Sequence, residues 1–188
     1  MSEALASVAE LSRRARQIQL LALDVDGVLT DGRLHFDREG DAGKTFSVRD
    51  GFGLRLLREA GLGLAIITGR QSPSVRARAG ELGVDDVLED VRDKASALLA
   101  LATRRQIDVQ AIAFLGDDWP DLGALRLAGL AGAPCDAEPA VRAVCHWVAS
   151  RRGGHGAVRE FAEALLGWRG EYAAALARYH AGEGRAAG

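Results

Sequence analysis

The stretch LLALDVDGVLTDG, residues 20–32, begins as a run of apolar residues and ends in acids and glycines. Its first half has the composition of a buried strand. Asp24 and Asp26 follow directly, where that strand ends. Because burying a carboxylate is costly unless a positive charge pairs with it, the two acids imply a cationic partner close by.

Two further apolar runs, LGLAIIT (62–68) and AIAFLGDD (111–118), also end in polar residues. Helical spacing with start and stop signals separates the runs, over residues 51–61, 72–83, 93–106 and 119–130. Weaker strands are expected at 86–88, 130–133 and 147–149. Apolar strands that alternate with helices of this length predict an α/β fold, with a doubly wound, mostly parallel sheet covered by helices on both faces.

The segment between Gly32 and Asp50 breaks this alternation. RLHFDREGDAGKTFSV, residues 33–48, alternates around a glycine-rich turn, which predicts a β-hairpin insertion. The expected organisation is a helix over residues 1–17, one main domain over 18–168, and a C-terminal helix followed by a flexible tail over 169–188.

Polar groups follow each of the three main strands. They are Asp24 with Asp26, Thr68, and Asp117 with Asp118, and Lys94 stands at a helix start between the last two. Ligands of open α/β sheets bind at the carboxyl ends of the strands, so these groups are expected to meet there. All the candidate ligands are oxygens, which favours a hard ion such as Mg²⁺. Any one of these residues could simply cap a strand or turn, but four such positions at strand ends favour a site.

A carboxylate beside Mg²⁺ suits phosphoryl transfer. Asp24 is placed to attack phosphorus and form an aspartyl phosphate that water later cleaves. Asp26, two residues on, is placed to protonate the leaving oxygen and later to deprotonate the water. Thr68 and Lys94 are expected to hold the phosphoryl oxygens.

Together DVDGVLTDG, IITGR, Lys94 and GDDWPD resemble the motifs of the haloacid dehalogenase superfamily of phosphatases, over about residues 18–168. The resemblance implies that Asp24 is nucleophile and metal ligand and that Asp26 is the acid/base, binding metal through its backbone carbonyl. It also implies that Asp117 completes the Mg²⁺ site with Asp118 in or near its outer shell, and that Gly69 and Arg70 help to bind phosphate.

More narrowly, FSVRDGFG (46–53), GDDWPDL (116–122) and RGGHGAVREF (152–161) resemble segments of the phosphatases that release an eight-carbon acid sugar, a lipopolysaccharide precursor. A related nine-carbon substrate stays open, because the catalytic set would be the same. Asp50, Gly51 and Arg152 are candidate sugar contacts. The glycines of residues 153–156 could instead serve only a tight turn.

Many members of this superfamily carry a cap domain after the first or the second motif. Here Gly27 to Ile67 has room for the hairpin and one helix, and Gly69 to Lys94 for one helix and a short strand. A capless enzyme must shield its site in another way. The resemblance implies a tetramer, and we expect a neighbouring subunit's hairpin, with its C-terminal tail as a further candidate, to close the pocket.

The bulk composition excludes several classes of protein. The 188 residues carry 24 basic against 26 acidic side chains, a net charge of −2, which argues against a nucleic-acid or anionic-membrane surface. No run approaches the ~18 apolar residues of a membrane span, and the first residues do not read as a signal peptide, so a cytoplasmic protein is expected.

Two other motifs and two other classes of protein are alternatives to the phosphatase. GKT at 43–45 resembles a nucleotide-binding loop, but Arg38 stands where that motif needs glycine, and an EF-hand loop starting at Asp24 also fails. A receiver-like signalling domain would have adjacent acids after its first strand, whereas this chain has D-x-D. A non-catalytic homologue is disfavoured by the intact set of acids, threonine and lysine.

Overall fold

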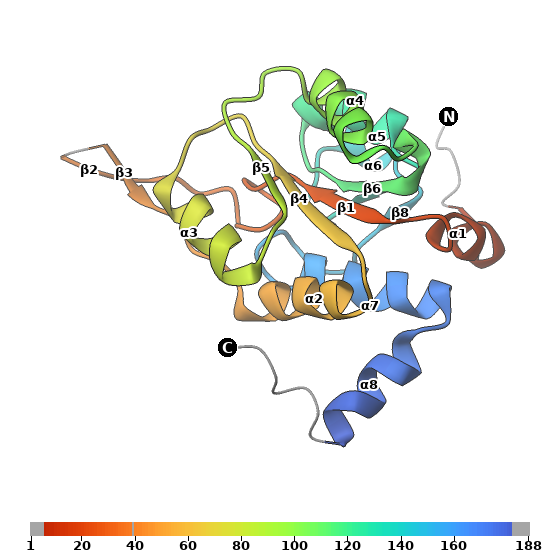
Figure 1. Cartoon of the computed structure of the whole chain (residues 1–188). Helices are drawn as coiled ribbons and strands as arrows, with labels where there is room; N and C mark the ends of the chain where they lie inside the picture. Colours follow the sequence, from red (N-terminus) through yellow and green to blue (C-terminus); the bar gives the residue numbers. More distant parts are fainter. Residues whose placement is uncertain (1–5, 39, 182–188) are drawn as a thin grey trace.

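The computed structural model describes residues 6–38 and 40–181, and its centre is a six-stranded parallel sheet (Figure 1). The strand order is β5-β4-β1-β6-β7-β8. The strands are β1 Leu20–Leu23, β4 Gly63–Ile67, β5 Asp86–Leu88, β6 Ile112–Leu115, β7 Leu130–Ala133 and β8 Trp147–Val148. The chain runs outward from β1 through β4 to β5 and then returns to β6 on the other side of β1. This reversal creates a crevice at the carboxyl ends of the central strands, where ligands of such sheets bind.

Helices cover both faces of the sheet, as predicted (Figure 1). Along β1, Leu21 and Leu23 belong to one buried cluster and Leu20 and Ala22 to the other, because successive side chains of a strand point to opposite faces. The first cluster contains residues of α1 Val8–Ala15, α2 Val48–Glu59, α3 Pro73–Leu82 and α7 Ala157–Arg169. The second contains residues of α4 Lys94–Arg105, α5 Leu122–Leu127 and α6 Pro139–Arg142.

Local capping explains where the helices depart from their predicted bounds. α2 begins before residue 51 because the Ser47 side chain accepts the N–H of Asp50 at 3.4 Å and caps the first turn. The helix predicted at 119–130 is a 3₁₀ turn, η2 Trp119–Asp121, followed by α5, and it stops early because Leu130 already belongs to β7. A second 3₁₀ turn, η1 Val109–Ala111, precedes β6.

The predicted hairpin forms a separate two-stranded antiparallel sheet of β2 His35–Asp37 and β3 Gly40–Gly43. It projects away from the body of the molecule (Figure 1). Every residue of β2 is exposed, and Phe36 exposes 68% of its surface. Between β1 and β4 the described residues otherwise form only α2, and between β4 and α4 only α3 and β5. This agrees with a chain that has no cap domain.

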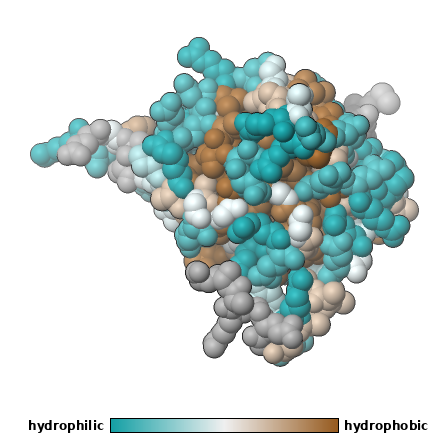
Figure 2. Space-filling view, viewed as in Figure 1, coloured by the Kyte–Doolittle hydropathy of each residue, from teal (hydrophilic) through white to brown (hydrophobic). Residues whose placement is uncertain are grey.

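The C-terminal helix is α8 Tyr172–His180. Its Tyr179 hydroxyl donates to the Glu59 carboxylate of α2 at 2.9 Å. The Tyr179 ring packs edge-on against Phe52, with 5.1 Å between the ring centroids. Residues 1–5 and the predicted flexible tail at 182–188 lie outside the described residues. None of the described helices has the length and apolarity that a bilayer crossing requires. On the face seen in Figure 2, hydrophilic residues cover the periphery, and apolar residues are visible mainly over the central sheet.

Candidate active site

The carboxyl ends of β1, β4 and β6 bring the predicted site residues together. Leu23 at the end of β1 pairs with Ile66 on one side and Leu115 on the other, so the three strands end at one level. The next residues are therefore presented at one edge of the sheet. Asp24 donates its N–H to Leu115 at 3.0 Å, and Thr68 donates its N–H to Leu88 at 2.9 Å.

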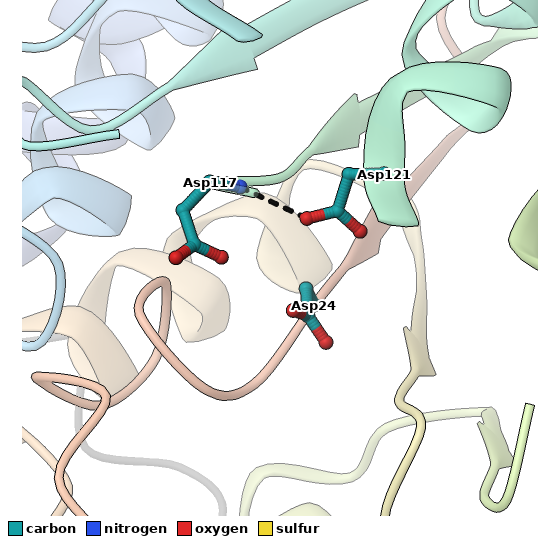
Figure 3. A group of neighbouring side chains, drawn as sticks. All are labelled: Asp24, Asp117 and Asp121. Atoms are coloured by element: carbon teal, nitrogen blue, oxygen red, sulfur yellow. Dashed lines mark hydrogen bonds between the residues drawn. The ribbon is translucent and has the colours of Figure 1, made fainter. Parts of the chain in front are cut away.

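Three carboxylates meet at this edge. Asp24, Asp117 and Asp121 each offer an oxygen, and these atoms all lie within 4.8 Å of one another (Figure 3). Asp24 extends from the end of β1, whereas the other two come from the segment after β6 (Figure 3). Carboxylates this close repel one another unless protons or a cation intervene.

Asp121 is a site residue that the sequence reasoning missed. Its Oδ2 accepts the backbone N–H groups of Asp117 at 3.0 Å and Asp118 at 3.3 Å. The η2 turn makes this possible, because it returns residue 121 to the end of β6. The signal was present in GDDWPD, whose last acid stands four residues after Asp117.

Lys94, at the start of α4, is the cation that faces these acids. Its Nζ lies 2.9 Å from Asp24 Oδ1 and 2.6 Å from Asp121 Oδ1, and the side chain is only 5% exposed. Burial lowers the pKa of Lys94, but the two neighbouring carboxylates outweigh it and raise the pKa above its ordinary value. Lys94 is therefore charged and fixed, as a group that binds phosphoryl oxygens must be.

One lysine does not neutralise three acids. Burial, and then the charge of Asp121, raise the pKa of Asp24 to about 6. Burial, and then the charges of Asp24 and Asp121, raise the pKa of Asp117 to about 8. Asp24 and Asp117 resist ionisation because they are buried beside other acids, so the cluster has the electrostatics of a cation site.

The donor set fits a magnesium ion. Asp117 Oδ1 is buried and has no hydrogen-bond partner. Both oxygens of Asp121 are already occupied, by Lys94 and by backbone N–H groups, so Asp24 and Asp117 are the acids available as ligands. A Cβ at Gly27 would lie 2.0 Å from Asp117 Oδ2, so glycine leaves room for this carboxylate. Carboxylate oxygens are the ligands that Mg²⁺ prefers.

A cleft of about 640 Å³ opens over these groups. Most of the predicted site residues line it: Asp24, Asp26, Thr68, Gly69, Arg70, Lys94, Asp117 and Asp118. Residues that the sequence reasoning did not single out complete the lining: Gly32, Val91, Arg92, Pro120 and Asp121. Arg92 and Arg70 add positive charge to a cleft otherwise rich in acids.

Asp26 lies between two cations. The ammonium group of Lys44 contacts its Oδ1, and Arg70 Nε lies 3.6 Å from its Oδ2. The Lys44 side chain is 1% exposed. Lys44 is the lysine of the GKT sequence at residues 43–45, which resembles a nucleotide-binding loop but lacks its first glycine. Its place beside Asp26 could not be read from spacing, because it depends on how the residues after β3 return to the end of β1.

The predicted sugar contacts Asp50 and Gly51 do not line the cleft. Asp50 is 1% exposed, and its carboxylate accepts the N–H groups of Gly156 at 3.1 Å and Arg159 at 2.9 Å. It therefore links the start of α2 to the start of α7. Burial raises the pKa of Asp50 although these hydrogen bonds oppose it. A Cβ on Gly51 would lie 2.1 Å from the Arg78 guanidinium, so its role visible here is close packing.

Arg152 does not line the cleft either, and the loop that contains it packs against the segment after β1. Arg152 Nε lies 3.2 Å from Asp136. The loop N–H groups are occupied: Gly153 donates to Asp136 at 3.0 Å and Gly154 to Val28 at 3.0 Å. A Cβ on Gly153 would lie 1.7 Å from the carbonyl oxygen of Gly27. Close backbone approach therefore requires glycine at position 153.

Comparisons with known proteins agree with this geometry. The family described as haloacid dehalogenase-like hydrolase matches residues 43–129. The 3-deoxy-D-manno-octulosonate 8-phosphate phosphatase of Yersinia pestis is 37% identical over 157 residues, which cover 84% of each chain.

Solved structures give the same result over more of the chain. The phosphatase of this name from Moraxella catarrhalis, in complex with magnesium, phosphate and KDO, is 39% identical with a TM-score of 0.89, covering 92% of this chain and 99% of that one. The cobalt-bound Haemophilus influenzae enzyme is 35% identical with a TM-score of 0.83, covering 87% and 99%. The predicted superfamily and fold are confirmed. This chain belongs to the haloacid dehalogenase-like hydrolases, in the family of the 3-deoxy-D-manno-octulosonate 8-phosphate phosphatases.

Proposed function

We propose that this chain is a Mg²⁺-dependent phosphatase that hydrolyses 3-deoxy-D-manno-octulosonate 8-phosphate to the free acid sugar and phosphate, a step in making lipopolysaccharide precursors. The observation that carries the proposal is the meeting of Asp24, Asp117 and Lys94 at one sheet edge, with one buried oxygen of Asp117 left unpaired. The substrates printed in the names of the relatives support the choice of acid sugar.

In the first half of the reaction, an oxygen of Asp24 forms a bond to phosphorus while the ester P–O bond breaks. The leaving sugar oxygen takes a proton from Asp26. Lys94 balances charge on the phosphoryl oxygens, and Thr68 with the Gly69 backbone holds them. When bound by Asp24, Asp117 and the Asp26 backbone carbonyl, Mg²⁺ would offset further charge on the phosphoryl group.

In the second half, Asp26 removes a proton from water as the water oxygen bonds to phosphorus. The bond between phosphorus and Asp24 breaks, and phosphate leaves. The carboxylate of Asp24 and the protonated Asp26 are thereby restored. Asp121 supports both halves without reacting, because it holds Lys94 and the backbone of residues 117 and 118.

Gly69, Arg70 and Asp118 line the cleft and are the proposed substrate contacts. Contacts from Asp50, Gly51 and Arg152 stay predictions of the sequence.

We also infer a cytoplasmic homotetramer in which a neighbouring subunit's hairpin covers the cleft. The projecting hairpin and its exposed Phe36 support this assembly, as does a cleft that the chain itself leaves uncapped. A monomer in sedimentation that is fully active at the same concentration would contradict it.

The test is phosphate release from a panel of sugar phosphates that includes the eight-carbon and the nine-carbon acid sugars, with Mg²⁺ present. We expect the eight-carbon ester to be preferred. Asp24→Asn should fold normally and lose turnover. Asp31→Asn removes an acid of the same loop that does not line the cleft, so it should stay active. Preference for the nine-carbon ester would change the assigned substrate. Absence of turnover on every ester would refute the phosphatase activity and favour a receiver-like or non-catalytic role.

A further inference from the structure

A buried lysine from the hairpin segment contacts the side chain of the acid/base. Lys44 directly follows β3, its side chain is 1% exposed, and its ammonium group contacts Asp26 Oδ1. We propose that Lys44 is a positioning residue that aims the Asp26 carboxyl group at the leaving oxygen of the substrate. This inference rests on the proposed function and adds to it the residue that orients the proton donor.

The neighbours of Lys44 in the chain define where it starts. Before it, Gly43 has a φ of 117°, which side chains rarely adopt, and a Cβ there would come within 3.1 Å of Ser74 Oγ on α3. After it, Phe46 packs against the core, and Ser47 caps α2. The lysine is thus delivered from a fixed backbone, which is what a group that orients another must have.

The two oxygens of Asp26 have different surroundings. Lys44 occupies Oδ1, whereas Oδ2 faces the longer contact with Arg70, whose Nε lies at 3.6 Å and whose side chain is 57% exposed. Asp26 lines the cleft. A carboxyl group free to rotate would present either oxygen in many directions. The contact with Lys44 fixes the group and leaves Oδ2 for the proton transfer.

A buried lysine is costly unless a charge pairs with it, so the pair is maintained in the folded protein. Proton transfer by a positioned side chain contributes about 10²–10⁴-fold to a rate, and misplacement by about 1 Å loses much of that. Removal of Lys44 should therefore harm those esters whose leaving oxygen needs a proton. An alkyl ester such as the sugar phosphate is of this kind, whereas 4-nitrophenyl phosphate is not, because its phenolate is stable without a proton.

The experiment compares kcat/KM for the two esters in the full-length enzyme with Mg²⁺. For each ester, kcat/KM reports the steps up to cleavage of the ester bond, before water attacks the phosphoenzyme. For Lys44→Met we expect a loss of about 10- to 100-fold on the sugar phosphate and less than about threefold on the nitrophenyl ester. Lys44→Arg, which restores the cation, should recover most of the loss.

Two controls keep the result interpretable. Arg13→Met removes a cation of α1, outside the hairpin and the cleft, whose side chain is 64% exposed and pairs with Glu10, and both esters should be unaffected. Thermal unfolding verifies that each variant is folded, and Lys44→Gln replaces Lys44→Met if the latter is not.

Equal losses on both esters would overturn the inference, because Lys44 would then act on the phosphoryl group that the two share. Unchanged kcat/KM on both would overturn it as well. A wild-type enzyme inactive on both esters would overturn the proposed function and this inference with it, so the two failures are distinguishable.

Discussion

Replacing Asp117 by asparagine should stabilise the metal-free protein while abolishing magnesium binding. Burial and the neighbouring acids raise the pKa of Asp117 to about 8, against an ordinary value of 3.8. At pH 7 the folded chain must take up a proton that the unfolded chain does not bind, which costs about 4 kcal/mol. An asparagine at this position would need no such proton. We expect a gain of about 1–4 kcal/mol, because water and side-chain movement reduce electrostatic penalties.

The sign of the pH dependence follows from the same shift. Both Asp24 and Asp117 have raised pKa values, about 6 and about 8, so the folded metal-free protein binds protons more tightly than the unfolded chain. The contribution of these two acids to stability is therefore largest at low pH, and it is lost as the pH rises from the ordinary value of 3.8 to about 6 for Asp24 and about 8 for Asp117. In Asp117→Asn the part of this loss that extends from about pH 4 to about pH 8 should disappear.

The assay is thermal unfolding at pH 7 in EDTA and in excess Mg²⁺. At this chain length about 1 kcal/mol corresponds to about 2–4 °C in Tm. Wild type should gain about 2.7 kcal/mol at 100 times the Kd for Mg²⁺, whereas Asp117→Asn should gain almost nothing. Asp118→Asn is the matched control. It removes the exposed carboxylate next to Asp117, and we expect it to change the stability in EDTA little. A less stable Asp117→Asn in EDTA, or one that binds Mg²⁺ like wild type, would refute the reasoning.

Three further predictions concern the groups around the site. Asp50→Ala leaves two N–H groups at the start of α7 without their acceptor and should cost about 2–4 kcal/mol in urea unfolding. Gly153→Ala would place a Cβ against the Gly27 carbonyl oxygen and should cost about 1–3 kcal/mol and lower activity together. Burial lowers the pKa of His146, whose Nδ1 accepts the Ala131 N–H at 2.9 Å, so stability should fall as the pH drops below 6.5, and His146→Asn should show a shallower fall of Tm.

The sequence predicted the elements whose signals are local. A buried parallel strand is an apolar run, and its end is marked by the first polar residue, so β1, β4 and β6 and the acids after them could be read directly. That parallel strands end at one edge was enough to gather Asp24, Thr68 and Asp117. The chemistry of the cluster followed from the residue types.

The residues that were missed depend on geometry that no spacing rule contains. Asp121 reaches the cluster because a 3₁₀ turn, and not a regular helix, follows β6. Lys44 reaches Asp26 because the residues directly after β3 lie next to the segment that follows β1. The contact of Asp50 with N–H groups at the start of α7 could not be read either, because nothing in the spacing shows that these two helix starts meet.

The most direct test of the account is to find where the phosphoryl group resides during turnover. The enzyme would be mixed with Mg²⁺ and the eight-carbon sugar phosphate, quenched in acid within one turnover, digested and mapped by mass spectrometry. The account predicts one phosphoryl group on the peptide that contains Asp24, at that residue, and none in Asp24→Asn. A phosphoryl group on another side chain, or turnover in Asp24→Asn at the wild-type rate, would contradict it.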